Sequence, residues 1–148
     1  MTRRVMRGFK PALLRSAREA RGLGVSDAAR LSGINPASLG RWEAGTRSPQ
    51  VDALRAVLEV LGCKIQDVVD VPKSSRFPGD WRVLRGLTQP QLGKLAGVST
   101  SAIGRIERGE GGLSNSTRDL IAAALEIQPD ELTEAFARAQ KRPPGKPA

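Results

Sequence analysis

The run LGRWEAG at residues 39–45 reappears 64 residues later as IGRIERG at residues 103–109. Extending the comparison in both directions keeps the two copies in register. The matched pairs include Arg18 with Arg82, Gly22 with Gly86, Leu23 with Leu87, Gly33 with Gly97, and Ile34 with Val98. A repeat of this length indicates a tandem duplication, so the chain is expected to contain two related domains.

The spacing of apolar residues, caps and helix breakers predicts that both domains are all-α, each a bundle of about five short helices. In the first domain the predicted helices cover residues 10–20, 25–32, 36–44, 49–61 and 64–69. In the second domain they cover residues 80–85, 89–96, 100–108, 116–125 and 129–140. Pro36 and Pro49 suit the first turn of a helix, which needs no N–H there, and Thr88 and Ser99 are natural N-caps.

These boundaries divide the chain into five segments. They are a basic N-terminal arm at 1–9, the first domain at 10–70, a short linker at 71–77, the second domain at 78–139, and a basic tail at 140–148. Pro72 stiffens the linker. Both terminal segments are predicted to be disordered in the free protein, because they are polar, charged and lie outside the two cores.

The charge balance favours a polyanionic partner. The chain has 24 basic and 15 acidic residues, for a net charge of +9. Both halves are basic. Residues 1–70 include 12 basic and 7 acidic residues, and residues 71–148 include 12 basic and 8 acidic residues. Basic charge alone also fits a solvated surface, so it supports a nucleic-acid partner only together with other signals.

The residues that are missing exclude several classes of site. The chain contains no His and no Tyr, and its one Cys is Cys63. A zinc site, a Cys–His catalytic pair and an internal disulfide are therefore not expected. We identify no catalytic residues and expect neither enzyme activity nor a cofactor. Without a long apolar run or a recognisable signal peptide, the sequence predicts a cytoplasmic protein with no membrane partner.

Both halves resemble the Cro and lambda-repressor type of helix-turn-helix domain, also called the XRE type. In the second half, GLTQ at 86–89, GVS at 97–99 and the run at 103–109 follow the family pattern nearly position for position. The first half departs from it at Gly24 and Val25, where the family usually has Thr-Gln. The resemblance covers roughly residues 10–70 and 78–139, and it implies two lambda-repressor-like five-helix domains in tandem.

The resemblance also implies that the third helix of each domain enters the major groove of double-stranded DNA. Carried over position by position, it assigns base reading to Pro36, Ala37, Arg41, Thr100, Ser101 and Arg105. The two arginines are the strongest candidates, because a guanidinium can bond both major-groove acceptors of guanine. Contacts to the DNA backbone are assigned to Asn35, Ser38, Arg47, Gln89, Ser99 and Arg108.

Other repeated positions have structural roles by the same comparison. The resemblance pairs Arg18 with Glu43 and Arg82 with Glu107 as buried ion pairs that hold the first helix to the third. By their helical spacing, the apolar residues of the third helices face the two cores; they are Leu39, Trp42, Ile103 and Ile106.

Two features of the sequence have more than one interpretation. Gly40 and Gly104 stand at the same place in both copies, although glycine inside a helix costs about 1 kcal/mol relative to alanine. They either let the helix backbone approach DNA or are simply inherited by duplication. The N-terminal arm, with Arg3, Arg4 and Arg7, is either a DNA-contacting arm or a solvated leader.

The leading hypothesis is a sequence-specific transcriptional regulator of bacterial or phage type, associated with the nucleoid. Repression is the simpler mode, because occupying a promoter needs no further machinery. The alternative is a protein-binding module of antitoxin or anti-activator type, with a degenerate first domain that binds a regulatory protein partner. A homodimer is a further hypothesis, since Leu132, Ala135 and Phe136 could form an exposed apolar stripe on the last helix.

Overall fold

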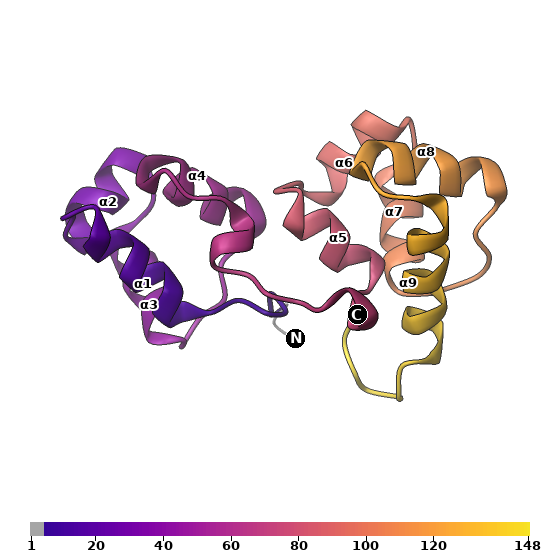
Figure 1. The fold of residues 1–148 in the computed structure, drawn as a ribbon, viewed down its shortest axis with the longest axis horizontal. Coiled ribbons are helices and arrows are strands. Elements are labelled where there is room, and N and C mark those ends of the chain that lie inside the picture. Colours follow the sequence, from indigo (N-terminus) through magenta and orange to yellow (C-terminus); the bar gives the residue numbers. More distant parts are fainter. Residues whose placement is uncertain (1–4) are drawn as a thin grey trace. The chain divides into compact units, whose positions relative to one another are not determined.

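Helices supply the regular secondary structure of the residues that the structure describes, 5–148. In this computed structural model the chain divides into two units after Asp70 (Figure 1). The all-α fold class predicted from the sequence is confirmed over these residues. Each unit has its own core and is described by itself below.

The described part of the first unit, residues 5–70, contains four α-helices followed by a single 3₁₀ turn. They are α1 (Pro11–Ala20), α2 (Val25–Ser32), α3 (Pro36–Ala44), α4 (Val51–Leu61) and η1 (Ile65–Asp67). The predicted fifth helix at 64–69 is thus only one turn long. The backbone is drawn into pairing instead, because Val69 forms an isolated bridge with Phe9 and the N–H of Lys10 donates to the carbonyl of Val68 at 2.8 Å.

The second unit contains five α-helices. After the 3₁₀ turn η2 (Lys73–Ser75) come α5 (Pro78–Leu84), α6 (Gln89–Ala96), α7 (Thr100–Glu107), α8 (Asn115–Leu125) and α9 (Pro129–Lys141). The segment predicted as a plain linker therefore holds a helical turn. The last helix also runs into the predicted tail, since Gln140 and Lys141 belong to α9.

Capping residues start the helices of the second unit, and a glycine ends the second helix of each unit. The side-chain oxygens of Thr88 and Ser99 accept from backbone N–H groups at the starts of α6 and α7, as predicted. Gly33 and Gly97 end α2 and α6 with φ of +74° and +71°. Glycine adopts this left-handed conformation without steric cost, so the chain can reverse into the next helix.

The predicted core residues of the third helices are confirmed. Leu39 and Trp42 are buried in the first unit, and Ile103 and Ile106 in the second. In both units these side chains leave the opposite face of α3 or α7 to the solvent, which is the arrangement expected of an amphipathic helix.

The prediction of an exposed stripe on the last helix is wrong. Leu132 and Ala135 are 0% exposed and Phe136 is 7% exposed, within the core cluster of the second unit. The helix packs its apolar side against α5, α7 and α8 of its own unit. An amphipathic pattern shows that a face is covered but not by what, and here the covering helices are internal.

Gly109 and Gly45 occupy matching positions with the same left-handed backbone, φ +71° and +75°, but in different surroundings. A Cβ on Gly109 would lie 2.6 Å from the backbone N of Gln140, at the end of α9. A Cβ on Gly45 would meet only Pro11 Cγ at 3.6 Å. Both alanine variants must adopt the left-handed region, which costs about 1–2 kcal/mol, but only Gly109→Ala also displaces a helix.

We therefore expect Gly109→Ala to lower the free energy of unfolding by about 1–3 kcal/mol more than Gly45→Ala, the usual range for overpacking. Urea denaturation of the two variants and the unmodified chain measures this difference. Equal losses for both variants would show that α9 does not press on Gly109 in solution.

Candidate nucleic-acid interface

A buried ion pair ties the first helix of each unit to the third. Arg18 Nε and Nη2 donate to the two carboxylate oxygens of Glu43 at 2.7 and 2.8 Å. Arg82 makes the same two bonds to Glu107 at 2.6 and 3.0 Å. All four side chains are buried, and the hydrogen bond to Glu43 raises the pKa of Arg18. The two ion pairs implied by the resemblance are confirmed.

Each arginine also holds the turn before the second helix. The remaining guanidinium nitrogen, Nη1, donates to the carbonyl of Leu23 from Arg18 at 2.7 Å and to the carbonyl of Leu87 from Arg82 at 2.8 Å. One guanidinium in each unit thus joins three segments: the first helix, the following turn and the third helix. A planar fork with five donors is suited to this role, whereas a lysine is not.

The second unit adds a third donor to its ion pair. Gln89 Nε2 donates to Glu107 Oε1 at 3.0 Å. The matching residue in the first unit is Val25, which has no donor to offer. The side chain that the sequence assigned to a DNA phosphate therefore lies against the buried carboxylate, and an amide NH₂ keeps a second hydrogen for another acceptor.

The repeated glycines have different neighbours in the two units. A Cβ on Gly104 would lie 3.2 Å from Arg108 Nη1 and 3.8 Å from the amide of Gln89, so the glycine leaves room for both side chains. A Cβ on Gly40 would meet nothing within 4 Å. An alanine at position 104 would therefore require a small shift of the Arg108 guanidinium, whereas no described residue of the first unit crowds position 40.

The N-terminal ends of α3 and α7 are open to solvent. The candidate base readers there are all exposed; they are Pro36, Ala37, Thr100 and Ser101. Asn35 and Ser99 cap these helices, with side-chain oxygens that accept from the N–H of Ala37 at 2.8 Å and of Ala102 at 3.1 Å. The helix starts therefore combine exposed side chains with the partial positive charge of the helix dipole.

The two candidate arginines differ in exposure and in hydrogen bonding. Arg41 is exposed, and its guanidinium makes no hydrogen bond to the described residues. Arg105 is half-buried, because its Nη1 donates to the carbonyls of Glu110 at 2.7 Å and Gly112 at 2.9 Å. The duplicated sequence made them equivalent, whereas the structure assigns Arg105 a second role in shaping the loop after α7.

The remaining candidates for backbone contacts lie on the surface around these helices. Ser38 is half-buried and Arg47 is exposed. Arg108 is exposed and its Nε donates to Glu110 Oε1 at 2.8 Å, a bond that lowers the pKa of the Glu110 carboxyl. The sequence analysis missed this carboxylate, although the GEGG run at 109–112 marks a tight loop in which nearby groups must meet.

The described part of the N-terminal arm is attached to the first unit. The N–H of Met6 donates to Ser48 Oγ at 2.7 Å, and Phe9 forms the bridge to Val69. This part of the arm is therefore more ordered than predicted. Arg7 lies in the described segment, whereas Arg3 and Arg4 lie outside the described residues.

Comparison with known families accounts for most of the chain. Residues 12–70 match a family described as a helix-turn-helix domain, and residues 80–132 match one described as helix-turn-helix. The chain belongs to the helix-turn-helix family. Two domains of the XRE type stand in tandem, as the sequence predicted. No curated protein matches the chain at a significant level.

Membership of the helix-turn-helix family gives the helices their names. The pairs α2–α3 and α6–α7 are the helix-turn-helix units, and α3 and α7 are their recognition helices. Such domains are those of DNA-binding regulators. Among residues 5–148, no helix combines the length and the apolar composition that crossing a membrane requires.

Proposed function

We propose that this helix-turn-helix protein is a sequence-specific regulator of transcription that binds double-stranded DNA through α3 and α7. The observation that carries the proposal is that the same ion pair, Arg18–Glu43 or Arg82–Glu107, holds each recognition helix rigidly with its N-terminal end exposed. A rigid helix whose first turn reaches solvent is what major-groove reading requires. The net charge of +9 supplies the attraction to a polyanion.

Base reading is assigned to the exposed residues at the starts of the two helices and to one arginine a turn later in each. In the first domain these are Pro36, Ala37 and Arg41, and in the second Thr100, Ser101 and Arg105. Apolar side chains can contact a thymine methyl, hydroxyls can bond several base edges, and arginine favours guanine. The two domains therefore prefer different bases, and one chain reads an asymmetric site.

Backbone contacts follow from the groups that border the helix starts. The proposed set is Asn35, Ser38, Arg47, Gln89, Ser99 and Arg108. Gln89 can keep its bond to Glu107 and use its second amide hydrogen on a phosphate, which would fix the register of the second domain on the duplex. The first domain lacks this contact because of Val25.

Repression is the proposed mode, because bound protein at a promoter blocks it without a further domain. On this proposal the protein acts at the nucleoid, in the cytoplasm of its cell. Residues 1–7 would add backbone contacts beside the first domain through Arg7 and the two arginines before it.

Selection of bound sequences from a random duplex pool, at about 150 mM salt where nonspecific attraction is weakened, tests the proposal. We expect one long asymmetric motif with two unlike halves. A palindrome with half-sites about 34 Å apart would instead indicate a symmetric dimer led by one domain. No enrichment over the starting pool would overturn the proposal.

The start of α3 favours a second candidate function for the first domain. Pro36 and Ala37 offer no side-chain hydrogen bond, and Val25 replaces the amide found in the second domain. Because these three positions lack hydrogen-bonding side chains, the first domain suits capture of another regulator or of a toxin. In that case the second domain alone would read DNA.

A further inference from the structure

The C-terminal segment of the second domain folds onto the end of the recognition helix. Arg142 Nη1 donates to the carbonyls of Arg108 and Ala139, both at 2.6 Å. Its Nε donates to the carbonyl of Lys146 at 2.8 Å, which closes residues 142–146 into a turn. Gln140 Nε2 donates to the carbonyl of Gly111 at 3.1 Å. This segment, predicted to be a disordered tail, therefore docks beside the C-terminal end of α7.

The turn and the end of α7 enclose an open concavity of about 240 Å³ with three cationic side chains in its lining. They are Arg108, Arg142 and Lys146, and the rest of the lining is mostly glycine, proline and helix-end residues. This volume is below the range of pockets that enclose an organic ligand. Its charge and openness suit a phosphate group on a larger polyanion, which arginine and lysine recognise through charge-assisted hydrogen bonds.

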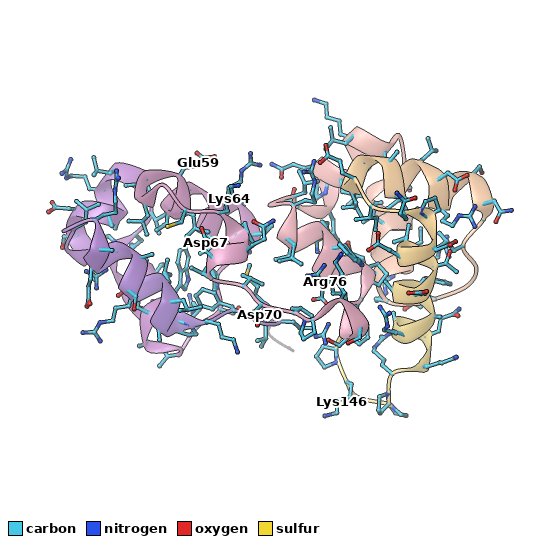
Figure 2. The ribbon with its side chains drawn as sticks, in the orientation of Figure 1. Glu59, Lys64, Asp67, Asp70, Arg76 and Lys146 are labelled. Carbon is cyan, nitrogen blue, oxygen red and sulfur yellow. The ribbon has the colours of Figure 1, made fainter. Side chains whose placement is uncertain are left out.

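The charges around the concavity leave donors for an incoming anion. Figure 2 labels Lys146 on the C-terminal turn, and its ammonium group makes no hydrogen bond to the described residues. Arg142 donates from Nε and Nη1 to backbone carbonyls, which leaves its Nη2 as a donor for an anion. Arg108 donates from Nε and Nη2 to Glu110, and its Nη1 lies 3.2 Å from the place of a Cβ on Gly104. Arg142 and Lys146 therefore supply the free donors, and Arg108 adds its positive charge.

We propose that this concavity binds a DNA backbone phosphate at the far end of the second recognition helix. Eight residues make α7 about 12 Å long, close to the major-groove width of about 12 Å. With the start of the helix at the base edges, a helix of this length brings its other end toward a phosphate-lined wall of the groove. Ser99 borders the start of the helix, and the C-terminal turn with Arg142 and Lys146 borders its end.

The described residues of the first domain lack the elements that form this site. This domain ends in the turn η1 instead of a long helix, and the position that matches Gly109, Gly45, has only Pro11 nearby. The added phosphate contact therefore makes the second domain the stronger anchor. This inference rests on the proposed function, because it places the phosphate in a duplex read by α7.

Lys146→Gln tests the site with little risk to the fold, because the lysine side chain makes no hydrogen bond to the described residues. We expect the slope of log Kobs against log salt to fall in magnitude by about 1, and binding at about 150 mM salt to weaken roughly fivefold. The loss should be equal on the selected duplex and on an unrelated one. Lys73→Gln, on the exposed turn η2, is the charge-matched control and should leave the slope unchanged.

The outcomes separate this inference from the proposed function. If the unmodified chain shows no sequence preference but Lys146→Gln still lowers the slope, the regulator proposal fails and the phosphate site stands. If the unmodified chain binds DNA selectively and Lys146→Gln has the same salt slope, the phosphate site is overturned and the regulator proposal stands. A final experiment titrates the protein with inorganic phosphate and monitors the NMR amide shifts of residues 142–146. Saturable binding there with an unchanged salt slope on DNA would assign the concavity to free phosphate and overturn the inference.

Discussion

Glu107→Ala will lower the free energy of unfolding of the second domain by about 3–5 kcal/mol, the usual loss when one partner of a buried ion pair is removed. The variant leaves the guanidinium of Arg82 buried without its carboxylate, and Gln89 loses its acceptor as well. Glu43→Ala should cost less in the first domain, because Glu43 accepts from Arg18 alone among the described residues. Urea denaturation followed by circular dichroism, fitted for two domains, gives both values.

Glu134→Ala is the control for loss of a glutamate without loss of a buried pair. Its carboxylate is 67% exposed and lies 3.6 Å from Arg138 on the same helix, so its removal should cost less than 1 kcal/mol. A combined Arg82→Met and Glu107→Leu variant should recover most of the stability, since it leaves no unpaired buried charge. Equal losses for Glu107→Ala and Glu134→Ala would refute the structural role of the pair.

The double variant Arg41→Ala with Arg105→Ala will abolish selective DNA binding. Each arginine that pairs with a guanine discriminates by about 1–3 kcal/mol, so both together account for roughly 30-fold to 10⁴-fold. Nonspecific binding should fall only by the loss of two charges. Anisotropy titrations on the selected duplex and on a scrambled duplex measure the ratio of the two affinities.

The two single variants should have different effects on stability, because Arg41 is exposed and Arg105 holds a loop through hydrogen bonds. Arg41→Ala removes an exposed side chain and should change affinity without changing stability. Arg105→Ala also frees the loop at 110–112 from its two carbonyl bonds, so it should increase hydrogen exchange there. Arg55→Ala, on α4 beside Glu59, is the charge-matched control. A double variant that keeps its selectivity would contradict base reading by these residues, and retained binding to a protein partner would support the second candidate function.

The repeat explains why much of the fold was predictable. Because two copies of one pattern had to fit the same structure, Arg18 and Glu43 could be matched with Arg82 and Glu107, and the family resemblance supplied their pairing. Local rules were sufficient for the caps, since a Ser or Thr before an apolar run satisfies the free N–H groups of the helix that follows. Helix positions and core faces followed from the same short-range signals.

Features that depend on distant partners were not predictable. The bridge between Phe9 and Val69 shortens the last helix of the first domain. No local sequence pattern predicts this pairing. The carbonyl partners of Arg105 and the docking of Arg142 depend on how α9 meets the loop after α7. Arg105 and Arg41 occupy the same position in the repeat. The sequence at that position does not show which distant groups each side chain will contact.

The exposed starts of α3 and α7 have a consequence for how the protein can change over evolutionary time. Pro36, Ala37, Thr100 and Ser101 are exposed at the helix starts, outside the core and the ion pairs, and surface substitutions of this kind usually alter stability by no more than about 0.5 kcal/mol. If these residues read bases as proposed, each copy can acquire a new DNA preference without losing its fold. A duplicated domain with this layout can be reprogrammed one half at a time, while the other half keeps the protein on its old target.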